Sequence, residues 1–137
     1  AKAQNKPIYI DFTGHGCVNC REMEANVWSY PRVLEMLREN YVIIALYVDD
    51  KTTLPEDEWM LNSKGKKKKT SIGSKNSAFQ ISKFEANAQP YYCLMGHNGE
   101  VLVEPRSYNL DKDAFVEFLK KGIENFNNGV SIRNIFE

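Results

Sequence analysis

Apolar residues recur along this chain in two spacings, and each spacing predicts one kind of element. Short apolar runs rich in β-branched and aromatic residues predict four strands, over residues 7–13, 41–49, 91–95 and 101–104. The Asn98-Gly99 pair predicts a hairpin turn between the last two strands. The run over 41–49 is uncharged up to Asp49, so we expect a central strand that is covered on both faces.

Apolar residues spaced three and four apart predict four helices, over residues 17–28, 31–40, 76–86 and 110–126. In the third helix, Phe79, Ile81 and Phe84 are candidates for the buried side. Asp111 or Asn109 is expected to cap the last helix. Each helix would thus present one apolar face to a sheet.

The order of these elements is strand, helix, strand, insertion, helix, two strands and helix. A strand–helix–strand unit is parallel and a hairpin is antiparallel, so we expect an α/β fold with a mixed central sheet and helices on both faces. A chain of 137 residues can form one hydrophobic core. We therefore expect a single domain over 1–137, with a charged insertion at about 50–75 and a short C-terminal tail over 127–137.

Charge narrows the choice of partners. The 18 Lys and Arg residues balance 18 Asp and Glu residues, so we expect no nucleic-acid partner. The longest apolar run is too short to cross a bilayer, so we expect no direct membrane insertion by this chain. The lysine-rich run over 64–69 is expected to be solvated and mobile; a patch for nucleic acid or anionic lipid is the alternative. The start at Ala1 rather than at a methionine favours a processed protein or an excised domain.

Cys17 and Cys20 lie where the first predicted strand meets the first helix, with two residues between them. Residues three apart on a helix have Cβ atoms about 5–6 Å apart, so a small adjustment lets this pair form a disulfide. The first turn of a helix has unpaired N–H groups and a partial positive charge, which favour the thiolate at Cys17. We therefore expect Cys17 to attack a partner's disulfide and the more buried Cys20 to resolve the mixed disulfide.

Two other interpretations of the cysteines stay open. The pair could be half of a tetrahedral zinc site, but such a site needs two more ligands. Cys93, His15 and His97 remain, without a second close pair, so we expect no metal ion and no dissociable cofactor. The pair could also be two inert thiols. We expect Cys93 to be a small buried hydrophobe.

Several motifs together resemble the thioredoxin fold, a three-layer sandwich. They are IDFTGHGCVNC, the proline before a strand in AQPYYCLM, the HNGE turn and the last amphipathic helix. CVNCREMEANVW, followed by Pro31, is similar to the C-terminal thioredoxin-like domain of the transmembrane thiol:disulfide interchange protein DsbD.

This resemblance implies a thiol:disulfide oxidoreductase that relays electrons as a reductant of partner protein disulfides. Other domains of the same membrane protein would be among these partners. The implied location is the periplasmic side of a bacterial membrane, with the cytoplasm as the alternative. We expect the chain to be a monomer.

The resemblance also implies catalytic roles for two acids. Asp11 matches a buried acid, with a raised pKa, that takes and returns the proton of Cys20. Glu24 matches a second acid, one helical turn past Cys20. From the residues alone, Asp11 also fits a strand-end cap and Glu24 a solvated helix residue.

The resemblance also implies that residues near the cysteines bind the partner. Pro90 matches a cis-proline that faces the cysteines and leaves the backbone of Gln89 free to pair with an extended partner segment. A trans proline in a plain loop is the alternative. The turn around the cysteines would complete the contact surface, through His15, Gly16, Val18 and Asn19.

The sequence departs from the resemblance at Gly16, where thioredoxin-like domains usually have tryptophan. Glycine removes an apolar contact surface and loosens the turn. His15 could replace part of this contact or donate to the thiolate, but a plain exposed histidine is the simpler expectation. The missing tryptophan leaves a redox-inactive thioredoxin-like interaction module as an alternative function. A metal-binding module, based on the CxxC pair, is the other alternative.

Overall fold

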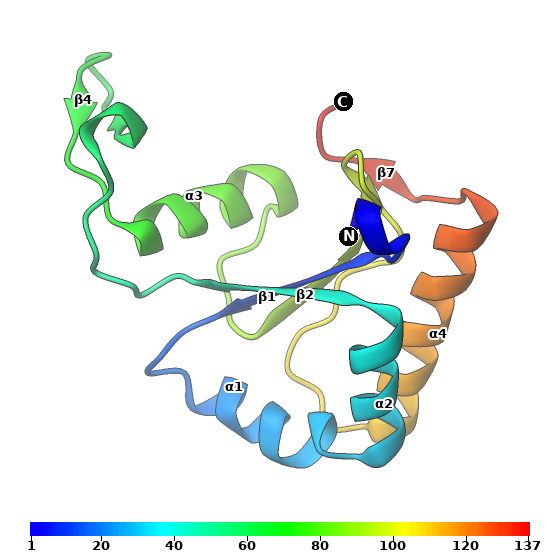
Figure 1. The fold of residues 1–137 in the computed structure, drawn as a ribbon. Coiled ribbons are helices and arrows are strands. Elements are labelled where there is room, and N and C mark those ends of the chain that lie inside the picture. The colour runs from blue at the N-terminus through cyan, green and yellow to red at the C-terminus, as the bar shows by residue number, and fades with distance from the viewer.

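The computed structural model describes residues 1–137. Its centre is a five-stranded sheet (Figure 1), with strands in the order β2 (Val42–Tyr47), β1 (Ile8–Thr13), β5 (Tyr91–Met95), β6 (Glu100–Val101) and β7 (Arg133–Asn134). β1 and β2 are parallel, and the other neighbours are antiparallel. The predicted mixed sheet is confirmed.

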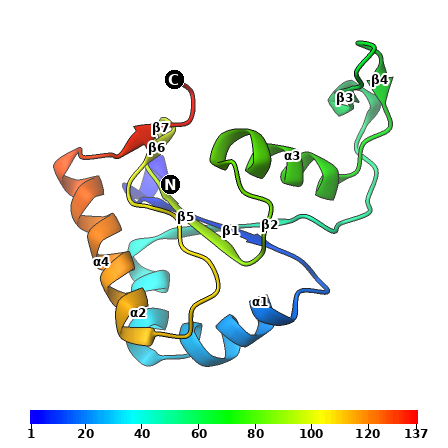
Figure 2. The same cartoon turned by 180° about the vertical axis from the view of Figure 1, so that it is seen from behind.

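Helices cover both faces of the sheet, as Figures 1 and 2 show. One face is covered by α3 (Ile72–Phe84). The other face is covered by α1 (Val18–Met23), the π-helical turn η2 (Glu24–Trp28) that continues it, α2 (Pro31–Asn40) and α4 (Lys112–Asn128). A short 3-10 helix, η1 (Lys2–Gln4), precedes β1. The three-layer arrangement agrees with the expected thioredoxin-like fold.

The alternation of side chains along β1 divides the core between the two faces. Tyr9 packs with α2, α4 and the helical segment over 18–28 in a cluster of 13 buried residues. Ile10 and Phe12 pack with α3 in a second cluster of 7. Because successive strand residues point to opposite faces, Asp11 and Thr13 share the face of Tyr9. Asp11 therefore lies on the side of the sheet that α1 covers.

The position of β2 overturns a prediction. We expected a central strand, but β2 pairs only with β1 and forms an edge of the sheet. Ile43 and Ile44, which point to opposite faces, are 41% and 39% exposed. The prediction was wrong because an apolar run reports the composition of a strand, whereas the number of its neighbours is set by the topology.

The charged insertion is an ordered projection rather than an irregular segment. It contains a 3-10 turn, η3 (Glu56–Glu58), and a two-stranded hairpin of β3 (Met60–Leu61) and β4 (Lys67–Lys68). The helix after it, α3, begins earlier than predicted, because Ser71 accepts a hydrogen bond from the Ser74 N–H at 3.1 Å and caps the helix there.

The buried side of α3 differs from the prediction at one position. Phe84 is buried and Phe79 is partly buried, but Ile81 is 47% exposed and Gln80 is fully buried in its place. The Gln80 amide donates to the Ala88 carbonyl and accepts from the Gln89 amide, both at 2.9 Å. Because these bonds pair the amide, its burial is tolerated.

The C-terminal segment joins the sheet. Asp111 caps α4 by accepting from the Ala114 N–H at 3.0 Å, and Gly129, where φ is 66°, follows the last helical residue as the C-cap. The predicted tail then forms β7, which pairs with β6 and places Ile135 in the core. β6 itself is shorter than the strand predicted over 101–104. No helix of the structure is long and apolar enough to cross a membrane.

Candidate active site

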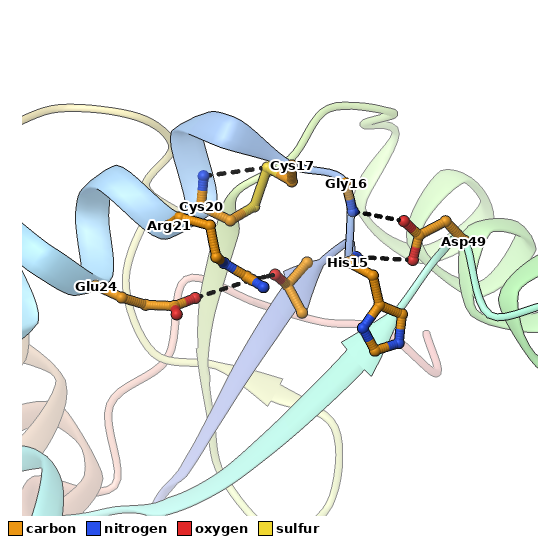
Figure 3. Close-up of polar contacts among 8 residues, drawn as sticks. His15, Gly16, Cys17, Cys20, Arg21, Glu24 and Asp49 are labelled. Atoms are coloured by element: carbon orange, nitrogen blue, oxygen red, sulfur yellow. Dashed lines mark hydrogen bonds and ion pairs between the residues drawn. A yellow bond between two sulfur atoms is a disulfide. The ribbon is translucent and has the colours of Figure 1, made fainter.

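The two cysteines of the CxxC motif form a disulfide at the start of α1 (Figure 3). Their Cα atoms are 5.3 Å apart. Cys17 is partly exposed and Cys20 is 1% exposed, in agreement with the predicted difference in burial. An accessible sulfur next to a buried one is the arrangement that the attacking and resolving roles require.

Cys17 is also the N-cap of α1. Its backbone is extended, with φ −85° and ψ 103°, and its sulfur accepts a hydrogen bond from the Cys20 N–H at 3.1 Å. The N–H group would otherwise have no partner, because the first turn of a helix lacks internal acceptors. The sulfur therefore lies where backbone donors and the helix dipole stabilise negative charge.

A carboxylate from a distant part of the chain holds the turn before Cys17. Asp49, just after β2, accepts from the His15 N–H at 2.9 Å and from the Gly16 N–H at 3.1 Å (Figure 3). These two backbone bonds lower the pKa of Asp49. A Cβ atom on Gly14 would lie 3.1 Å from the carboxylate, so glycine there permits the close approach. The Asp49 carboxylate thus holds the turn before Cys17, although Gly16 has no aromatic side chain that could pack there.

The His15 ring lies on Tyr47, with ring centroids 4.1 Å apart and an interplanar angle of 6°. Figure 3 shows the ring pointing away from the disulfide. The alternative in which His15 donates to Cys17 is therefore not what this oxidised structure contains. His15 is exposed and remains accessible to a partner.

Asp11 is a buried carboxyl group beneath α1. It is 4% exposed, and its Oδ1 atom has no hydrogen-bond partner. Burial raises the pKa of Asp11 to about 7, the charge of Glu24 adds to the increase, and Arg21 opposes it. A carboxyl group with this pKa can take up and release a proton near neutral pH.

Arg21 links Glu24 to the end of β1. Its Nη2 atom donates to Glu24 Oε2 and to Thr13 Oγ1, both at 3.0 Å. Arg21 and Glu24 keep 44% and 37% of their side-chain surface exposed, so this ion pair adds little stability. Its effect is electrostatic, because both charges act on Asp11.

The Gln89–Pro90 peptide bond is cis, as expected. Pro90 is buried and precedes β5, whose Tyr91 pairs with Phe12. The same antiparallel register puts Pro90 beside Thr13, at the end of β1 that leads to Cys17. The Gln89 side chain turns instead to α3, where its amide is bonded to Gln80.

The surroundings of the disulfide form an open surface. Val18 is 76% exposed and Asn19 is exposed, so both residues between the cysteines face solvent. Three surface hollows are present, and neither cysteine lines any of them. An open surface fits a macromolecular partner better than a small ligand.

The metal alternative has no support in this geometry. No group of three or more His, Cys, Asp or Glu residues comes together as a candidate metal site. Cys93 is fully buried on the α3 side of the sheet, and burial raises the pKa of its thiol.

The sequence prediction missed three residues that shape the site. These residues are Asp49, Tyr47 and Arg21, to which the sequence pattern gives no role in the site. Asp49 and Tyr47 reach the turn only because β2 runs parallel to β1 and both strands stop at the same end of the sheet. No local pattern signals a contact between residues 33 positions apart.

The chain is similar to known proteins over most of its length. A family model described as a thioredoxin-like domain matches residues 1–123. Three solved structures share the fold. A DsbH oxidoreductase matches with a TM-score of 0.64 and 17% identity, over 90% of this chain and 76% of that chain. A thioredoxin from Thermus thermophilus matches with a TM-score of 0.66 and 15% identity, over 94% of this chain and 82% of that chain. A thioredoxin-fold protein from Helicobacter pylori matches with a TM-score of 0.56 and 13% identity, over 90% of this chain and 86% of that chain. No curated protein matches the sequence.

At these identities the solved structures support the fold alone. The family match covers most of the chain, and the CxxC pair occupies the turn between β1 and α1 as a bonded disulfide. These features support thiol–disulfide exchange as the chemistry of the site. The chain belongs to the thioredoxin-like family.

Proposed function

We propose that this protein is a protein-disulfide reductase that passes two electrons to a partner through Cys17 and Cys20. The observation that carries the proposal is the Cys17–Cys20 disulfide at a helix N-terminus, in which Cys17 is partly exposed and Cys20 is buried. A disulfide that closes so short a loop adds little chain-entropy stability, so exchange explains it better than stapling.

In the proposed reaction, the Cys17 thiolate attacks one sulfur of the partner's disulfide. The S–S bond breaks, the partner's second sulfur leaves as a thiolate, and a mixed disulfide remains. Cys20 then loses its proton and attacks Cys17, which releases the partner's other thiolate. The partner gains two electrons and leaves as two thiolates, which take up protons from the solvent, and the protein ends as the observed disulfide.

Asp11 is the proposed acceptor of the Cys20 proton. Its buried carboxyl group lies on the sheet face that α1 covers, and its pKa of about 7 allows proton exchange at physiological pH. Glu24 tunes this group through its charge, which favours the protonated form, while Arg21 favours the ionised form.

Partner binding is assigned to the surface around Cys17. Val18, Asn19 and His15 are exposed beside the attacking sulfur. The segment at Gln89 and Pro90 borders the same end of β1, where an extended partner segment could pair with the backbone by strand addition. Gly16 leaves this surface flat, since it adds no side chain.

The narrower setting follows the resemblance to DsbD. In that setting the chain works on the periplasmic side of a bacterial membrane, takes electrons from another domain of a larger membrane protein and passes them to a second thiol-redox protein. The CVNCREMEANVW motif supports this setting. In this proposal the protein acts as a monomer without a bound cofactor.

Trapping the mixed disulfide tests the function. Reduced Cys20→Ser protein, mixed with a disulfide-bonded peptide, should accumulate a covalent adduct through Cys17, because the resolving thiol is gone. Cys17→Ser should form no adduct, and Cys93→Ser is the matched control that should turn over like the unchanged protein. Equal reduction of the peptide by Cys17→Ser and the unchanged protein would refute the proposal and favour a redox-inactive interaction module.

A further inference from the structure

The charged insertion presents a cluster of lysines on a defined scaffold. We call residues 60–69, which contain β3 and β4, the basic hairpin; it projects beyond α3 (Figures 1 and 2). All of its lysines are exposed and none forms an ion pair: Lys64, Lys66, Lys67, Lys68 and Lys69.

Hydrogen bonds hold the basic hairpin in one conformation. Met60 pairs with Lys68, and the Met60 N–H also donates to the hydroxyl of the buried Thr70 at 2.9 Å. At the tip, Asn62 Oδ1 accepts from the Lys64 N–H at 2.9 Å and from the Lys66 N–H at 3.0 Å. The backbone that carries the lysines therefore forms a regular hairpin, and their side chains all reach solvent.

The basic hairpin is anchored at the same end of the sheet as Cys17. Its base is the bridge between Thr53 and Ser71, four residues along the chain from Asp49, which binds the Gly16 N–H. At about 3.3 Å per extended residue, the path from Gly16 through Asp49 and the bridge to Lys69, the hairpin lysine nearest to that bridge, is at most about 30 Å long. A protein interface of about 800 Å² per partner is about 30 Å across. One partner can therefore cover both features.

The charge of the basic hairpin is local, since the whole chain is neutral. Two of the nearby acids have other partners: Glu58 pairs with Lys75 at 3.3 Å, and Asp50 accepts from the Thr52 N–H at 2.9 Å. The five lysines of the hairpin still outnumber the three acids of η3 (Glu56–Glu58), so the projection keeps a positive charge. Leu61, opposite Lys67, is 66% exposed and adds an apolar contact between the charges. A surface of this kind attracts an acidic polypeptide.

We propose that the basic hairpin is a docking arm for acidic protein substrates, and that it selects partners whose acidic residues lie within about 30 Å of the disulfide that Cys17 attacks. This inference rests on the proposed reductase function and names its substrate class. Lysines on an open hairpin also prevent strands from pairing with other chains. That role alone would give no preference among substrates.

Two disulfide peptides separate these roles. They share one sequence around the disulfide and carry either four Glu or four Lys residues about nine positions away, a reach of about 30 Å. Pre-reduced protein is mixed with each peptide at low salt, and formation of the Cys17–Cys20 bond is followed in a single turnover. The neutral bis(2-hydroxyethyl) disulfide reports the chemistry without docking.

The variants compare equal changes of charge. The hairpin variant is Lys66→Gln, Lys67→Gln and Lys68→Gln; the matched control is Lys2→Gln, Lys120→Gln and Lys121→Gln, which lie on η1 and α4. The unchanged protein should react about fivefold faster with the acidic peptide than with the basic one. The hairpin variant should lose this preference, the control should keep it, and about 0.5 M salt should remove it.

The outcomes distinguish the two proposals. If the unchanged protein reduces neither peptide nor the neutral disulfide, the reductase function fails. If it reduces all three but does not distinguish the peptides, or if both variants lose the preference equally, the docking arm fails while the function stands. Binding of the hairpin to anionic vesicles or RNA without peptide preference would also overturn the docking arm.

Discussion

Asp11 is the residue whose charge should matter most for stability, because folding moves its pKa from 3.8 to about 7. Between these values the unfolded chain is ionised while the folded protein keeps the proton. Stability should therefore fall as pH rises from about 4 to about 7 and level off above that, by up to about 4 kcal/mol at about 1.4 kcal/mol per pKa unit.

Replacing Asp11 tests the predicted direction of this pH dependence. Asp11→Asn cannot ionise, so the oxidised variant should gain about 2–4 kcal/mol over the unchanged protein at pH 8 and much less at pH 5, measured by urea unfolding. Asp50→Asn is the control, because Asp50 is only partly buried and its pKa is lowered by the hydrogen bonds from Thr52. A gain that is equal at both pH values would contradict a buried, protonated Asp11.

Asp49 should order the turn before Cys17. Asp49→Ala removes the acceptor of two adjacent N–H groups, so the amide hydrogens of His15 and Gly16 should exchange about tenfold faster, which corresponds to about 1.4 kcal/mol. Peptide reduction should slow as well, since the turn positions Cys17. Asp50→Ala is the neighbouring control, and equal exchange in both variants would show that Asp49 does not hold the turn.

At the scale of elements, the two parallel strands should respond differently to the same substitution. Ile10 on β1 is 8% exposed and Ile43 on the β2 edge is 41% exposed. Ile10→Ala should lower the free energy of unfolding by about 3 kcal/mol, whereas Ile43→Ala should lower it by less than about 1 kcal/mol. A similar loss at both positions, measured by urea unfolding, would mean that β2 is covered in solution.

The junction between β2 and α3 depends on Gly73. A Cβ atom there would lie 2.6 Å from the Val48 carbonyl oxygen and 2.7 Å from the Asp50 nitrogen, and backbone atoms cannot move aside cheaply. Gly73→Ala should therefore destabilise the protein by about 1–3 kcal/mol, although alanine favours helices. Ser74→Ala, at the exposed neighbouring position, should change the free energy of unfolding, measured by thermal denaturation, by only a few tenths of a kcal/mol.

At the scale of the whole molecule, zero net charge and a pI near 7.0 leave little electrostatic repulsion between copies. We expect a monomer at pH 8.5 and weak self-association near pH 7, where charge no longer opposes contact along the apolar β2 edge. Sedimentation velocity at the two pH values measures this. A stable dimer at both would contradict the expected monomer.

The sequence by itself determined the elements and the nucleophilic pair. Apolar spacing located the main strands and helices, because side-chain periodicity is a local property. The CxxC spacing and its place before a helix identified the disulfide, since both depend on neighbouring residues. The burial of Asp11 and the cis bond at Pro90 were inferred from resemblance and are present in the structure.

Only the tertiary structure decided what depends on strand order and distant contacts. It placed β2 at an edge, added β7 to the sheet, buried Gln80 in place of Ile81, and brought Asp49 to the turn before Cys17. It also ordered the basic hairpin at the active-site end of the sheet. These features join residues far apart in the chain, and a local pattern of polar and apolar positions carries no information about such neighbours.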